Sequence, residues 1–213
     1  MKTSDLIAAL AAETPPVRSA SPAKILLTAA ALGSAVALGL LVLWLGVNPV
    51  RPVLAASWFW MKAGFAAALA LSGFLLLTRL ARPGAQLGRG AVALGALAIL
   101  AMAALAMHSS MRAEPGQMRE LWLGDTWKVC PFRILALSVP VYLGLVWALR
   151  RLAPTRLALT GAAAGLSAGA LAAVIYGLYC REWAAPFVLV WYTLGVGLSA
   201  ALGALVGTRL LRW

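Results

Sequence analysis

Long apolar stretches alternate with short polar ones along the chain after its first residues. A helix needs about 20 apolar residues to cross the roughly 30 Å hydrocarbon core of a bilayer. Six stretches meet or approach this length: 25–47, 58–78, 91–111, 134–149, 157–180 and 183–208. Only the second carries a charged residue, Lys62, while the shortest contains Pro140. The pattern predicts an all-α polytopic membrane protein, with a bundle of six transmembrane helices at 25–213 behind a tail at 1–24.

The tail begins with a pattern typical of one short helix. Thr3 or Ser4 caps its start, and Asp5 lies in its first turn. Pro15 and Pro16 end it. Its narrow apolar face consists of Leu6, Ile7 and Leu10. Because helices shorter than about 12 residues are marginal in water, this segment is either a frayed, membrane-proximal tail or a helix that docks into the groove of a partner protein.

Composition narrows the classes of function. Hydrophobic residues make up 63% of the 213 residues and charged residues 11%, which excludes the charged surface of an ordinary soluble domain. Two cysteines are too few for a disulfide scaffold, and one histidine is too few for a histidine metal site. Six acidic residues leave little for carboxylate catalysis. We therefore expect a membrane protein that is not an enzyme.

The net charge of +12 raises the question of whether the protein binds nucleic acid. The 18 Lys and Arg residues are scattered between the apolar stretches, however, so they indicate membrane topology and no direct nucleic-acid binding. With the N-terminus inside, 11 of them fall on the cytoplasmic side and 7 outside. We expect both termini to be cytoplasmic and the loop at 112–133 to lie outside, with the lipid bilayer as a partner.

The two cysteines are predicted to lie on the same, outer side of the membrane. Cys130 precedes the span at 134–149 and Cys180 ends the span at 157–180. Counted from the inner turn between these spans, their heights differ by only about 6 Å at 1.5 Å per helical residue. Such a pair could form a disulfide, bind a thiophilic metal or be oxidised as a signal. Alternatively, both are small buried residues at helix ends.

Other residues admit both a structural and a functional interpretation. His108 lies near the outer end of its span and is either a third soft ligand for the thiols or an interfacial residue. We expect Lys62 to snorkel to the outer interface as an anchor. A stripe of small residues recurs every four positions and predicts close helix packing: Gly161, Gly165, Gly169, Ala173 and Gly177. A small transporter or channel, the alternative function, would need an ionisable residue near a span midpoint, and none of the six stretches has one.

Several motifs together resemble the NrsF family of bacterial anti-sigma factors, the negative regulators of sigma F. They are the tail pattern that runs from Asp5 to Val17, Trp127-x-x-Cys130-Pro131, Cys180-x-Glu182, Pro186-Phe187 and Trp191-Tyr192. The resemblance implies an inner-membrane protein whose cytoplasmic tail holds an extracytoplasmic-function sigma factor inactive. It also implies that the periplasmic residues Cys130 and Cys180 sense oxidants or heavy metals.

The resemblance, together with the helical pattern of the tail, assigns partner binding to seven residues: Asp5, Leu6, Ile7, Leu10, Pro15, Pro16 and Val17. No catalytic residue and no resident cofactor are expected. Heavy metal would bind only transiently, with Cys130, Cys180 and His108 as the candidate ligands.

Overall fold

The computed structural model describes residues 3–12, 21–46, 50–82, 84, 86–114 and 116–212, apart from the side chains of residues 6, 8–11 and 50–52. Within these residues the chain is helical and contains no strand. Six helical segments are long and apolar enough to cross a membrane, as predicted. They are α2 (Pro22–Trp44), α4 (Ser57–Leu80), α5 (Arg89–Met111), α7 (Cys130–Leu149), α8 (Leu157–Tyr176) and the continuous segment Ala185–Leu210.

The last span is built from three consecutive pieces. The short α9 (Ala185–Phe187) leads into a π-helical segment, η1 (Val188–Tyr192), and then into α10 (Thr193–Leu210). Pro186 lies in the first turn, where its missing N–H has no intrahelical partner to lose. The sequence pattern did not predict the π-helical segment.

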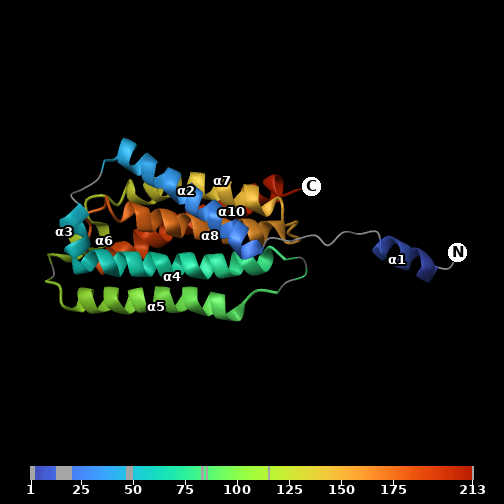
Figure 1. The fold of residues 1–213 in the computed structure, drawn as a ribbon. Helices are drawn as coiled ribbons and strands as arrows, with labels where there is room; N and C mark the ends of the chain where they lie inside the picture. The colour runs from blue at the N-terminus through green and yellow to red at the C-terminus, as the bar shows by residue number, and fades with distance from the viewer. Residues whose placement is uncertain are drawn as a thin grey trace.

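Three further helices are short and lie outside the six spans. The tail helix α1 (Thr3–Ala12) was predicted and stands apart from the bundle in Figure 1. The other two, α3 (Val50–Ala55) and α6 (Met118–Leu123), were not predicted because six residues are too few for an apolar period to be recognised. Both lie at the end of the bundle opposite α1 (Figure 1).

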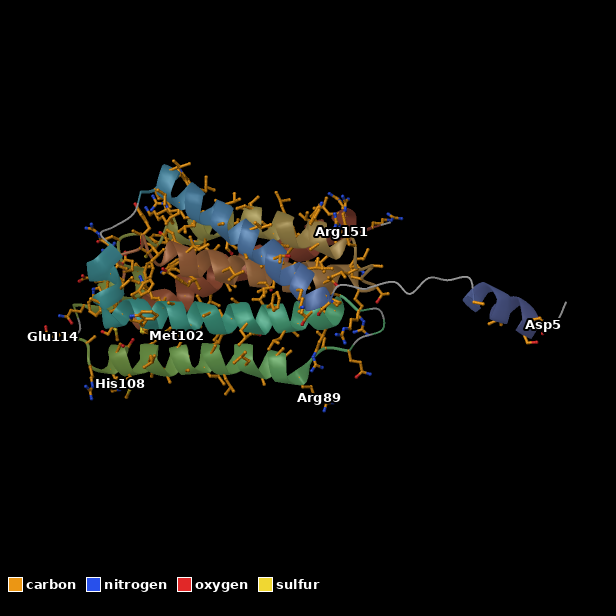
Figure 2. All side chains as sticks on the ribbon, viewed as in Figure 1. Asp5, Arg89, Met102, His108, Glu114 and Arg151 are labelled. Atoms are coloured by element: carbon orange, nitrogen blue, oxygen red, sulfur yellow. The ribbon has the colours of Figure 1, made fainter. Side chains whose placement is uncertain are left out.

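The bundle has two chemically different ends. We call the end with residues 116–130 and 177–185 the cysteine end, and the end with residues 21–24, 79–82, 86–89, 150–156 and 209–212 the tail end. The N- and C-terminal parts of the chain both lie on the side of the tail end (Figure 1). Side chains labelled in Figure 2 show the division: Arg89 and Arg151 lie at the tail end, whereas His108 and Glu114 lie at the other end.

The first span was predicted at 25–47 but α2 covers Pro22–Trp44, and two other spans have one end displaced by four residues. Helix α7 begins at Cys130 instead of residue 134, so Arg133 is inside the helix, and its guanidinium carbon lies 5.3 Å from the ring centre of Tyr179. Helix α8 ends at Tyr176 instead of residue 180, and the chain then turns before Cys180. Counting charge-free residues misplaced both ends, because a charge can be held by an aromatic ring and an apolar residue can lie in a turn.

Helix α8 lies at the centre of the bundle and packs against α4, α7 and α10. Of the six spans it has the largest buried share, 61%. Its small residues allow the backbone of α10 to approach closely: a Cβ on Gly165 would collide with the Ser199 carbonyl, and one on Gly161 with the Gly203 carbonyl. The predicted stripe is thus confirmed at these positions as the contact with α10.

Adding one methyl group at this contact should destabilise the protein. In Gly203→Ala the new Cβ would lie 2.5 Å from the Gly161 carbonyl oxygen and 3.0 Å from the Gly165 Cα, so both helices must move. We expect a loss of roughly 1–3 kcal/mol, measured as a lower melting temperature of the detergent-solubilised protein. Gly197→Ala, on the same helix with no atom within 4 Å of the new Cβ, is the matched control. Equal melting temperatures would contradict the packing argument.

Candidate functional site

The two cysteines are positioned by different kinds of backbone at the cysteine end. Cys130 is the first residue of α7, and its backbone N–H donates to the Thr126 carbonyl at 2.9 Å. Pro131 follows in the first helical turn, a position that suits its fixed φ. Cys180 lies in the non-helical segment 180–184 between α8 and α9, and its N–H donates to the Tyr176 carbonyl at 3.0 Å.

The structure brings the two thiols together. Both are free and buried, and the Cys130 thiol is positioned to donate a hydrogen bond to the Cys180 sulfur. The predicted proximity is therefore confirmed. This hydrogen bond, helped by the Lys62 ammonium and opposed by burial, lowers the pKa of the Cys180 thiol below its usual value. Because the thiolate is the reactive form of cysteine, Cys180 has the chemistry of the more reactive partner.

Lys62 contributes a buried positive charge to the same site. Its side chain is 1% exposed, and Nζ donates to the carbonyl oxygens of Cys180 at 2.7 Å and Glu182 at 2.9 Å. The ammonium also lies 4.5 Å from the ring centre of Trp58. The prediction that Lys62 snorkels to the interface was therefore wrong: the side chain does reach the cysteine end, but through the protein interior. Its two carbonyl partners explain this path. The sequence could not predict it, because no sequence pattern reveals which carbonyls lack a donor.

The Glu182 side chain ties the two cysteine-bearing segments together. One carboxylate oxygen, Oε1, accepts hydrogen bonds from the backbone N–H groups of Asp125 at 2.9 Å and Thr126 at 3.0 Å, and from the Thr126 hydroxyl at 3.0 Å. Gly124 makes room for this contact, since a Cβ there would lie 2.6 Å from Glu182 Oε2, and its φ of +56° also favours glycine. These hydrogen bonds thus connect the turn before α7 with the segment after α8.

Aromatic side chains surround the thiol pair. The rings of Tyr176 and Tyr192 lie 6.1 Å apart, and both side chains are fully buried. The Tyr192 hydroxyl interacts with the Cys180 sulfur, and the Tyr176 hydroxyl interacts with the Arg133 guanidinium. Trp191 Nε1 donates to the Trp122 carbonyl at 2.9 Å, which connects η1 with α6. The sulfurs therefore lie against the irregular part of the last span.

A cavity of about 490 Å³ opens onto this site. Its lining includes Cys180, together with Glu120, Gly124, Asp125, Thr126, Tyr179, Arg181, Glu182 and Trp183. Cys130 is not part of the lining and lies deeper, at 0% exposure. Of the two cysteines, Cys180, which is 3% exposed, is therefore the one next to the cavity.

The structure does not bring His108 to the thiols. Its side chain is exposed on α5 (Figure 2). Among the described residues, no group of three or more His, Cys, Asp or Glu side chains could hold a metal ion. The cysteines thus form a pair without a third soft ligand in this arrangement.

The predicted partner-binding residues lie at the other end of the chain. Asp5 and Ile7 are exposed on α1, with Ile7 at 62%. The side chains of Leu6 and Leu10, and all of Pro15, Pro16 and Val17, lie outside the described residues. An exposed isoleucine on a helix that stands apart from the bundle is available for a partner (Figure 1).

Sequence reasoning missed the parts of the site that Lys62 and Glu182 supply. Signals for both were present: Lys62 is the only charged residue in its apolar stretch, and Glu182 follows Cys180 by two residues. Neither signal identifies the groups that these two side chains contact, because those groups belong to the backbone of residues far away in the sequence.

Comparison with known proteins gives relatives over the whole chain. The family model for NrsF, described as a negative regulator of sigma F, matches residues 10–213. A protein of Azospira oryzae called a probable anti-sigma-F factor NrsF is 44% identical over 217 residues, with both chains fully covered. The anti-sigma-F factor NrsF of Caulobacter vibrioides is 38% identical over 215 residues, again with both chains fully covered. No solved structure matches the chain.

Proposed function

The chain belongs to the NrsF family, the negative regulators of sigma F, and on this premise we propose that it holds a sigma factor inactive at the inner membrane. It is an anti-sigma factor, so its role is regulatory and its partner is a sigma factor. We further propose that this sigma factor is of the extracytoplasmic-function class, is held by the N-terminal tail, and is released when the cysteine pair reacts. The buried pair Cys130–Cys180 is the observation that carries the sensing part of this proposal.

The rival function, a small transporter or channel, receives no support from the buried lysine. An ionisable residue in a transport pathway is expected near the membrane midplane. Lys62 lies six residues into the 24-residue helix α4, and its ammonium is bound to carbonyls of the cysteine end. This position suits a part of the cysteine site.

The membrane orientation that we propose follows the distribution of basic residues. Nine exposed Lys and Arg side chains lie at the tail end: Lys24, Arg79, Arg82, Arg89, Arg150, Arg151, Arg156, Arg209 and Arg212. Among the described residues of the bundle, carboxylates occur only toward the cysteine end: Glu114, Glu120, Asp125 and Glu182. The tail end is then cytoplasmic and the cysteine end periplasmic.

Reporter fusions test this orientation. Alkaline phosphatase requires an oxidising compartment for its disulfides, so a fusion after Gly116 should be active and a fusion after Trp213 inactive. A green fluorescent protein fused at each of the two positions should give the reverse pattern. Phosphatase activity after Trp213 without activity after Gly116 would invert the topology and move the cysteines to the cytoplasm.

The tail is the segment that we propose to bind the sigma factor. It contains a ten-residue helix at the end of the bundle where both termini lie (Figure 1). An amphipathic helix binds a partner by placing its apolar face into a groove. Leu6, Ile7 and Leu10 would form that face, and Val17 would extend it.

Charged substitutions on this face should release the sigma factor. Burial of one leucine is worth roughly 1.5–3 kcal/mol, so Leu6→Glu with Leu10→Glu should weaken capture at least about tenfold. The measurement is pull-down of the sigma factor by the full-length protein in membranes. Ala8→Glu, on the opposite side of the helix by its period of 3.6 residues, is the control. Normal capture by the double variant, with capture lost on deletion of residues 82–90, would refute the tail hypothesis.

The cysteine pair is the part that we propose to sense stress. A disulfide or a bound thiophilic metal would change the distance between the start of α7 and the segment after α8. Helix α8 packs backbone to backbone on α10, and α10 reaches the tail end, where the Leu210 carbonyl accepts a hydrogen bond from Arg150 Nε at 2.7 Å. Rigid helices in such contact can carry a small shift across the membrane.

Two thiols that act as one unit should give non-additive effects. We expect Cys130→Ser, Cys180→Ser and the double variant to lose the same share of the induced response. The measurement is expression from a sigma-dependent reporter after addition of an oxidant or of a thiophilic metal. Capture of the sigma factor without stress serves as the control for folding. Normal induction in both single variants would leave the thiols as packing residues.

A further inference from the structure

Lys62 is a buried charge that a sensor made of two thiols alone would not need. Among the described residues, its Nζ contacts two carbonyl oxygens and two aromatic rings, and no carboxylate lies within ion-pair distance. Burying an ammonium without a direct ion pair is unfavourable, although Glu182 and the two thiols are near enough to interact with it electrostatically. Ionisable side chains inside a membrane bundle are accordingly rare, and they mark functional sites.

The two carbonyl partners of Lys62 lie in a segment that has no helix to hold it. Residues 180–184 connect α8 to α9, and the carbonyls of Cys180 and Glu182 point to the ammonium from either side of Arg181. The other side of this segment is fixed by the Glu182 carboxylate on the turn at 125–126. Lys62 therefore determines where the backbone of Cys180 lies relative to α4.

Access to the two sulfurs is unequal. The cavity of about 490 Å³ is lined by Cys180 and not by Cys130. Both sulfurs are close enough to the Lys62 ammonium for a direct electrostatic interaction. In a site of low dielectric constant this interaction is strong, and it favours the negative charge that sulfur carries when it attacks an electrophile.

We propose that Cys180 is the sulfur that meets the signal and that Lys62 is its positioning residue. The inference rests on the sensing function proposed above. Lys62 holds the backbone of Cys180, which lines the cavity, beside Cys130, and its charge supports the attacking sulfur. Cys130 is the more deeply buried partner, and it responds after Cys180 has met the signal.

The first test compares the two sulfurs directly. Single-cysteine proteins, Cys130→Ser and Cys180→Ser, are treated in membranes with iodoacetamide, which forms a sulfur–carbon bond and releases iodide. Mass spectrometry gives the rate of alkylation. We expect Cys180 to react at least about tenfold faster than Cys130, because Cys180 lines the cavity and its backbone is held at the Lys62 ammonium, whereas Cys130 does not line the cavity. Equal rates, or a faster Cys130, would overturn the proposal.

The second test changes Lys62 in the Cys130→Ser background. Lys62→Met removes the ammonium that favours negative charge on the attacking sulfur, so alkylation of Cys180 should slow about tenfold or more. Lys62→Arg keeps the charge and the donors and should stay within about threefold of the parent. Lys128→Met removes an exposed lysine at the same end and is the matched control. Unchanged alkylation in Lys62→Met, or an Arg variant as slow as the Met variant, would refute the role of Lys62.

Folding and function are separated by two further measurements. Size-exclusion chromatography in detergent shows whether each variant remains monodisperse; if Lys62→Met does not accumulate, Lys62→Gln removes the charge with a polar side chain and should show the same slow alkylation. Reporter induction is recorded in parallel. If both serine variants induce normally while the alkylation rates follow the expectation, the sensing function fails and the positioning role of Lys62 stands.

Discussion

The close approach of α8 to α10 is the contact on which the rest of the bundle depends. Gly161 and Gly165 have no side chains that would keep these backbones apart. Helices α4 and α7 pack on the remaining faces of α8. Between helices in lipid the apolar surface provides little driving force, so dispersion contacts at short range must hold the helices together. Because the residues of the central helix are small, each neighbouring helix can approach it closely and make many such dispersion contacts.

The cysteine end follows a second constraint, which is that buried backbone groups need partners. The chain leaves the helical state after Tyr176 and resumes it at Ala185, and among the described residues no backbone N–H donates to the carbonyls of Cys180 and Glu182. Irregular backbone at this depth is tolerated where the protein supplies hydrogen bonds. Lys62 supplies them for two carbonyls, while Glu182 uses its carboxylate to fix the neighbouring turn. The thiol pair is thus held by groups that also satisfy the backbone.

This arrangement separates the two tasks that we propose, sensing and sigma-factor capture, along the bundle. The two thiols and the carboxylates lie toward one end, and the basic residues and the tail helix toward the other (Figure 2). The helices between them are apolar and contain few groups that could change charge. The signal that we propose is accordingly mechanical and is carried by packed helices.

The sequence by itself determined the six spans, the tail helix and the small-residue stripe, because bilayer thickness and helix geometry act on the chain locally. It also indicated that both cysteines lie at one height. The tertiary structure alone decided that Lys62 faces the interior, that Glu182 joins two turns and that His108 stays away from the thiols. The physical reason is that helices in lipid are apolar on all sides, so the pattern does not mark the buried face. Packing and hydrogen bonds between distant residues select that face.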